Sequence, residues 1–262
     1  MAVPKTARLL AAENVAPKAR RLVFEMAEPA ELGFVGGQYI IIDSGLTLPN
    51  GKAAKRAYSI ASADADQTRF ELIARRIDGG ICSNYLHQLE PGATLKFSGP
   101  WGKFLPVSLE ADAQVAGSTW VIATDTGITA ALGLLRGGAF RERRAQTTLL
   151  WLSSPTDDFV SRTFVSDRIA ALGASGGLRE VHMGDLPPVH HPERVAAGLA
   201  HFDALRRSSV PERVYLAGDG ALLYPFANAL ALAGLAESRV AIESFFNVPV
   251  KKVGVSAEGD AK

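Results

Sequence analysis

Cysteine is almost absent from this sequence, because Cys82 is the only one among 262 residues. A single thiol excludes a disulfide within the chain and an iron–sulfur cluster held by four thiolates. Any iron–sulfur centre that works with this chain must therefore belong to a partner protein.

Long apolar runs and an excess of charge are missing as well. No segment supplies about 18 uncharged apolar residues, and the first residues, MAVPKTARLL, lack the apolar core and cleavage site of a signal peptide. The formal net charge of +1 gives no reason to expect nucleic acid or an acidic membrane as a partner. We expect a soluble, cytoplasmic protein.

Metal-ligand spacing is also lacking. The sequence has five histidines, and two of them are adjacent at His190 and His191, beside Pro192. Neighbouring histidines without a cysteine or an HExxH spacing are more often ordinary loop residues than ligands. No metal is assigned.

The length and the 47% hydrophobic content suit two modest domains, each with its own core. Up to about Pro106, short β-branched or alternating runs are separated by Gly, Pro, Asn and Asp, which predicts an antiparallel β-barrel. The predicted strands are Arg21–Met26, Gln38–Asp43, Ala57–Ala61, Arg69–Ile77 and Thr94–Ser98, and one helix is predicted over Ser83–Leu89.

The second half alternates strands with helices, which predicts an α/β domain with a doubly wound parallel sheet. Strands are predicted at Thr119–Thr124, Thr147–Ser153, Leu178–Met183, Arg213–Ala217 and Arg239–Phe246, with helices at Gly127–Arg144, Asp157–Leu172, Pro192–Arg207 and Leu222–Leu235. We expect domains over residues 1–107 and 118–250, and a mobile polar tail over 251–262.

The first chemical signal is the tetrapeptide Arg56-Ala57-Tyr58-Ser59 on a predicted strand. Alternation along a strand points Arg56 and Tyr58 to one face, where a guanidinium fork suits a phosphate and an aromatic ring suits the isoalloxazine of a flavin. The Ser59 hydroxyl is then placed to hydrogen-bond flavin N5. By itself the tetrapeptide favours a packed tyrosine beside an exposed arginine.

A second signal follows at Gly79-Gly80-Ile81-Cys82-Ser83, where two glycines precede a predicted helix. The free N–H groups at the helix start and the Ser83 hydroxyl offer a phosphate site. An ordinary helix with a serine cap explains the same residues.

These segments occur in a definite order, together with Gly36-Gly37-Gln38-Tyr39, Pro91-Gly92 and Gly99-Pro100-Trp101-Gly102-Lys103-Phe104. In that order the sequence resembles the flavin domain of the ferredoxin–NADP reductase superfamily. The resemblance implies that Arg56 and residues Gly80, Ile81, Cys82 and Ser83 bind the phosphates of FAD, and that Tyr58 and Ser59 frame its ring.

The resemblance extends to the turn Thr124-Asp125-Thr126-Gly127, where Thr124 and Gly127 are implied to bind a nicotinamide dinucleotide. The family carries a glycine where this chain has Asp125. If the Asp125 carboxylate faces the pyrophosphate, repulsion weakens binding. If it instead caps the helix that begins near Gly127, its charge stabilises that helix.

Two later segments also match the family. Gly218 and Asp219 follow a predicted strand and are implied to face the nicotinamide, although the family's frequent cysteine is Ala217 here. At the end, Glu243 is implied to act beside the reacting rings with Ser59, and Phe245 or Phe246 to lie near the same pocket. For each phenylalanine alone, a buried core position is the favoured interpretation.

The family implies a monomeric oxidoreductase that passes electrons from NAD(P)H through FAD to a separate ferredoxin, flavodoxin or oxygenase component. A flavin-binding subunit or sensor with impaired NAD(P)H turnover is the alternative, and Asp125 and Ala217 favour it. Two carboxylates and no immediate arginine in residues 153–158, and Asp185 after the third strand, lead us to expect NADH as the donor.

Overall fold

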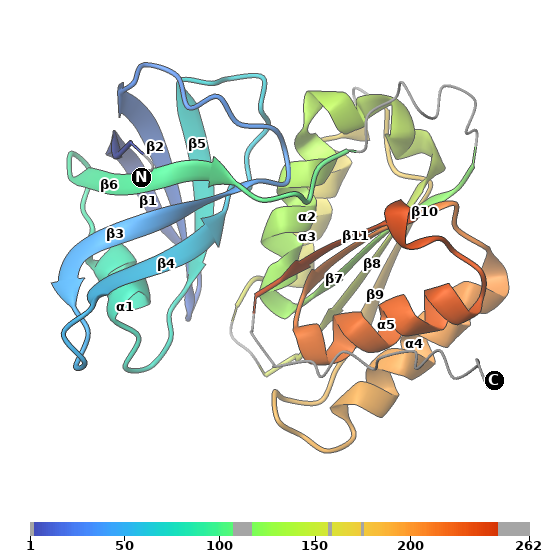
Figure 1. Cartoon of the computed structure of the whole chain (residues 1–262). Helices are drawn as coiled ribbons and strands as arrows, with labels where there is room; N and C mark the ends of the chain where they lie inside the picture. The colour runs from blue at the N-terminus through green and yellow to red at the C-terminus, as the bar shows by residue number, and fades with distance from the viewer. Residues whose placement is uncertain (1–2, 107–116, 157–158, 174–175, 246–262) are drawn as a thin grey trace, which may run out of the picture.

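The computed structural model describes residues 3–106, 117–156, 159–173 and 176–245. Two sheets lie side by side, one built from the first hundred residues and one from the rest (Figure 1). Helices α2 and α3 lie between them. The predicted tail over 251–262 falls outside the described residues.

The first sheet is antiparallel and has six strands in the order β4-β3-β6-β1-β2-β5, curled into a barrel-like form (Figure 1). Its strands are β1 Lys5–Ala16, β2 Ala19–Glu28, β3 Tyr39–Thr47, β4 Ala53–Ser59, β5 Arg69–Arg75 and β6 Thr94–Trp101, with helix α1 over Ile81–Gln88. The predicted barrel is confirmed.

Strand β2 shows why this sheet forms. Its buried residues Leu22, Phe24 and Met26 alternate with more accessible ones, so one face enters the barrel core. Strand β1 has only a short run of this alternation and an alanine-rich sequence, so its pattern does not predict a strand. Pairing with β2 and β6 provides its backbone hydrogen bonds.

The second sheet is parallel, with strand order β11-β10-β7-β8-β9, as a doubly wound α/β fold requires. Its strands are β7 Thr119–Thr124, β8 Thr147–Ser153, β9 Glu180–Asp185, β10 Arg213–Gly218 and β11 Val240–Ser244. The helices are α2 Ile128–Arg136, α3 Arg162–Ala170, α4 Arg194–Ser208 and α5 Gly220–Leu232.

Alternate residues of the central strands face different helices. Val121 and Trp151 belong to a core shared with α2 and α3, whereas Trp120 and Leu152 belong to a core shared with α4 and α5. The sheet is therefore buried on both faces, which explains why β7 and β8 are continuously apolar. The α2 and α3 core also includes Phe104 of the first unit.

Several predicted boundaries are wrong. The helix predicted over 127–144 breaks after Arg136, because Gly137 takes an extended conformation, and a 3-10 helix follows over Gly138–Gln146. The helix predicted from Asp157 begins at Arg162, where the Ser161 hydroxyl accepts a hydrogen bond from Phe164 N–H at 3.0 Å. In the described part of the chain, no helix combines the length and apolarity needed to span a membrane.

Candidate functional site

Strand β4 and the start of α1 form one surface. Arg56 is exposed on β4, Tyr58 is half-buried, and Cys82 of α1 donates a hydrogen bond from Sγ to the Ala54 carbonyl at 3.0 Å. Burial raises the pKa of the Tyr58 phenol. The two segments that the sequence assigned to one ligand therefore lie together.

The Ser83 side chain is used differently from the prediction. Its buried hydroxyl accepts from Ile77 N–H at 3.0 Å and donates to the Gly80 carbonyl at 3.1 Å, so it closes the loop before α1. The helix start at Gly80 has no side-chain cap. Backbone N–H groups, rather than the Ser83 hydroxyl, are the donors that α1 offers to an anion.

Tyr39 of β3 and Gly102 lie near Glu243 of β11 across the junction between the two units. Buried Ser59 pairs with Tyr39 in the β3–β4 ladder. Burial raises the pKa of Tyr39, and the nearby Glu243 charge raises it further. A Cβ added at Gly102 would lie 3.4 Å from Glu243 Oε2. Burial also raises the pKa of the half-buried Glu243 carboxyl. Ser59 and Glu243 therefore approach the same junction from different sheets.

A buried charge cluster occupies the carboxyl edge of the parallel sheet. The side chains of Asp125 and Arg194 are each only 4% exposed and form an ion pair. Arg194 Nε also lies 3.7 Å from Asp219 Oδ2, and Asp219 accepts a hydrogen bond from Ala221 N–H at the start of α5. Neither alternative for Asp125 drawn from the sequence anticipates Arg194 as its partner.

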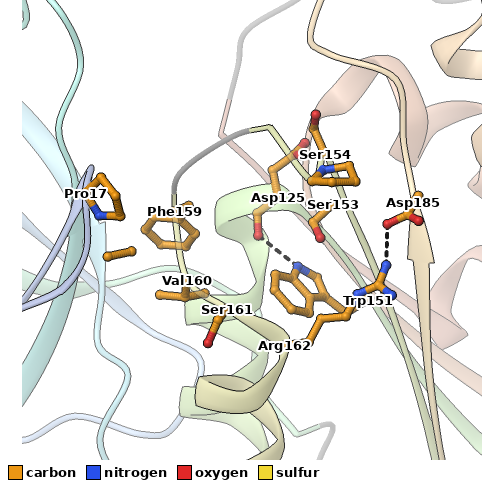
Figure 2. A pocket seen from close by; sticks show the side chains of 12 residues that line it. Pro17, Asp125, Trp151, Ser153, Ser154, Phe159, Val160, Ser161, Arg162 and Asp185 are labelled. Atoms are coloured by element: carbon orange, nitrogen blue, oxygen red, sulfur yellow. Dashed lines mark hydrogen bonds and ion pairs between the residues drawn. The ribbon is translucent and has the colours of Figure 1, made fainter.

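A pocket of about 480 Å³ opens beside this cluster. Figure 2 shows Asp125 and Trp151 on one side, Phe159 and Val160 on another, and Pro17 of the first unit facing them. Its polar lining includes Ser153, Ser154, Ser161 and an ion pair between Arg162 and Asp185. The volume lies in the range of small-molecule sites.

Comparison with known proteins agrees with this architecture. Residues 6–105 match the family model of the oxidoreductase FAD-binding domain. The ferredoxin–NADP reductase B of Sorangium cellulosum is 38% identical over 161 residues, which cover 62% of this chain and 63% of that protein. The first hundred residues thus belong to the oxidoreductase FAD-binding domain family, and the chain is similar to ferredoxin reductases.

Other reductases are similar over more of the chain. The ferredoxin–NAD(+) reductase component of the Xanthobacter autotrophicus alkene monooxygenase system is 32% identical over 70% of this chain and 51% of that protein. The cytochrome P450 reductase GcoB of Amycolatopsis has the same fold, with a TM-score of 0.70 and 23% identity over 93% of this chain and 70% of that chain. The chain spans less than two thirds of the length of the curated relatives it matches first.

In this ferredoxin reductase-like chain, the turns after β7 and β10 are packed directly together. The Thr124 hydroxyl accepts a hydrogen bond from Asp219 N–H at 2.8 Å. A Cβ at Gly127 would lie 2.0 Å from the Ala217 carbonyl, so Gly127 is required by contact with β10. This contact accounts for the glycine without a ligand, and the approach of a ligand to Gly127 stays a prediction.

The remaining predicted residues lie at the end of the sheet. Gly218 ends β10 and accepts a hydrogen bond from Phe245 N–H at 2.9 Å. Phe245 is half-buried and packs against the α2 and α3 core. Phe246 lies outside the described residues.

The sequence analysis missed two arginines. Arg194 starts α4 and Arg162 starts α3, each far along the chain from the carboxylate that it contacts. The signal available in the sequence was weak: an arginine in the first turn of a helix is unfavourable for the helix dipole unless a carboxylate compensates it.

Proposed function

We propose that this chain binds FAD on its first sheet and NAD(P)H on its second, and transfers electrons, as a monomer, to a separate acceptor. The acceptor class is a ferredoxin, a flavodoxin or an oxygenase component. The proposal divides the chain into a flavin domain, residues 1–107, and a nicotinamide domain, residues 118–250. The observation that carries it is the junction where Ser59 and Glu243 approach from the two sheets.

The residues on β4 and α1 fit a flavin nucleotide. Arg56 is exposed, with one guanidinium nitrogen bonded to the Lys55 carbonyl at 2.8 Å, and the start of α1 is uncapped. The buried Ser59 hydroxyl makes no hydrogen bond to the described residues, which leaves it available to a ligand. When bound, the flavin supplies the capacity to accept hydride and release electrons.

The chain's own residues orient the groups and manage protons. Arg56 and the backbone N–H groups at Ile81 and Cys82 hold phosphates, and Tyr58 packs along the ring. Ser59 donates a hydrogen bond to the ring edge. Glu243, whose pKa is raised by burial, holds a proton at its carboxyl near that edge over a wider pH range than an exposed glutamate.

Flavin binding is tested on the purified protein. We expect a yellow protein that releases FAD on denaturation, and we expect Arg56→Ala to lose much of that FAD because a phosphate partner is removed. Arg69→Ala is the matched control, since Arg69 is an exposed strand arginine of the same sheet that pairs with Glu25. A colourless wild-type protein that takes up no added flavin would refute the proposal.

Nicotinamide turnover is tested by mixing the flavin-loaded protein anaerobically with NADH or NADPH and following the flavin absorbance. Bleaching supports the reductase, whereas a flavin that stays oxidised supports the alternative of a subunit or sensor. The Arg194 ion pair compensates the Asp125 charge, which removes the main reason to expect impaired binding. We propose NADH as the preferred donor, because the ion pair with Asp185 makes Arg162 unavailable to the additional phosphate of NADPH.

A further inference from the structure

Glu71 of β5 is a buried carboxylate that contacts both units. It is 6% exposed, and its Oε2 accepts a hydrogen bond from Arg21 Nε of the first unit at 2.7 Å. Its Oε1 lies 3.5 Å from an Arg168 nitrogen of α3 and 3.8 Å from an Arg136 nitrogen at the end of α2. One carboxylate therefore holds guanidinium groups from both sides of the junction.

Asp64 makes a similar connection through the backbone. Its Oδ2 accepts a hydrogen bond from Gly36 N–H of the first unit at 3.0 Å. Its Oδ1 accepts one from Gly138 N–H, beyond α2, at 2.8 Å. Separating the units would break the hydrogen bond between Asp64 and Gly138 and the contacts of Glu71 with Arg136 and Arg168.

These contacts surround the chain segment that follows Ser59. Arg136 donates a hydrogen bond to the Ala61 carbonyl at 2.9 Å. A Cβ at Gly133 would lie 2.1 Å from the Ile60 carbonyl, so α2 touches this segment without a side chain between them. A shift of α2 is consequently a shift relative to the residues beside the proposed flavin ring.

The charges explain why Glu71 is required for this arrangement. Arg21, Arg136 and Arg168 converge on one carboxylate, and burial is the main cause of a lowered pKa at Arg168. Without the Glu71 charge, like charges from the two units face one another in a partly buried region, where salt screens them weakly. The network then pushes the units apart.

We propose that Glu71 and Asp64 form an interdomain clamp that sets the position of the nicotinamide relative to the flavin. The clamp rests on the proposed function, and its members are positioning residues because they touch neither ring. Hydride transfer needs reacting atoms about 3–3.5 Å apart, and a misplacement of about 1 Å costs on the order of 100-fold in rate. The clamp thus acts on the rate of flavin reduction more than on the affinity for either cofactor.

The test uses Glu71→Gln and Arg168→Met in the full-length, flavin-loaded protein. Arg168→Met removes only a guanidinium group that the nicotinamide unit contributes to the network. It keeps an apolar stem over Phe164, whose ring centroid lies 3.5 Å from the guanidinium carbon. If Glu71→Gln fails to fold, Arg168→Met alone tests the clamp. Stopped-flow reduction at saturating NADH should slow by about 10- to 100-fold, while flavin content and the Kd for NADH change little.

The matched control is Glu25→Gln. Glu25 also contacts two arginines, Arg8 at 2.8 Å and Arg69 at 3.3 Å, but its side chain is 31% exposed and all three lie in the first unit. Its reduction rate should equal that of the wild type. Equal slowing in the control, or an unchanged rate in folded Glu71→Gln and Arg168→Met, would overturn the clamp.

Hydrogen exchange separates the clamp from the proposed function. Amides around Gly138 and the end of α2 should exchange faster in Glu71→Gln and Arg168→Met than in Glu25→Gln. If neither NADH nor NADPH reduces the wild-type flavin, the proposed function fails, and this exchange difference still decides the clamp. Unchanged exchange would overturn it.

Discussion

Replacement of Asp125 by glycine, which the family resemblance implies at this position, should destabilise the parallel sheet rather than improve nicotinamide binding. The carboxylate and the Arg194 guanidinium are both nearly inaccessible to water and bonded to each other. After the substitution, Arg194 keeps the Pro187 carbonyl and the more distant Asp219 carboxylate, at 3.7 Å. A buried cation thereby loses its nearest counter-charge.

The magnitude follows from two opposing effects. Removing one partner of a buried ion pair costs about 3–5 kcal/mol. Asp125 has a positive φ of 47°, so glycine relieves a backbone strain of about 1 kcal/mol. The net loss is about 2–4 kcal/mol, which corresponds to a fall in Tm of roughly 5–15 °C in a domain of this size.

Thermal melting followed by circular dichroism measures the effect, alongside steady-state kinetics with NADH. Asp125→Asn is the matched control for charge, because asparagine tolerates positive φ and nearly preserves the shape, and it should also lower Tm. Adding Arg194→Met to Asp125→Gly should recover part of the loss, since no unpaired cation then remains. An unchanged Tm with a lower Michaelis constant for NADH would refute this reasoning and restore the repulsion hypothesis.

Three further outcomes are expected. Burial raises the pKa of Glu243, so the stability that its protonated form gives is complete below the unfolded pKa and is lost as pH rises through the native pKa. Urea unfolding should therefore show that Glu243→Gln stabilises the protein relative to the wild type more at pH 7 than at pH 4. Gly133→Ala should lower Tm, because its Cβ meets the Ile60 carbonyl; an unaltered melting curve would contradict that contact. Asp185→Asn should raise the ratio of NADPH to NADH efficiency by freeing Arg162, and a constant ratio in initial-rate assays would count against this pair.

Two of the buried parallel strands were predictable to the residue. Thr119–Thr124 and Thr147–Ser153 are short apolar runs, and the structure has β7 and β8 over the same bounds. Burial on both faces leaves no alternation to shift the boundary. Strand β1, by contrast, depends on pairing with β2 and β6, which lie elsewhere in the sequence.

Among the candidate site residues, Arg56 and Tyr58 could be placed together from the sequence because strand alternation is a local property. The use of the Ser83 hydroxyl could not, since its partners depend on how the loop at Ile77 folds back. Gly127 shows the same limit: a glycine in a turn after a strand suggests a ligand, yet its neighbour is the carbonyl of Ala217.

The sequence by itself determined the order of barrel and α/β unit and the motifs that resemble those of the ferredoxin–NADP reductase superfamily, because periodicity and turn residues are encoded over a few positions. Only the tertiary structure decided the partners of the buried charges. Asp125 and Arg194 are 69 positions apart, and Glu71 meets α3 across the junction. Such pairs depend on where helices return to the sheet. From the sequence alone, many arginines could be the partner of the same carboxylate.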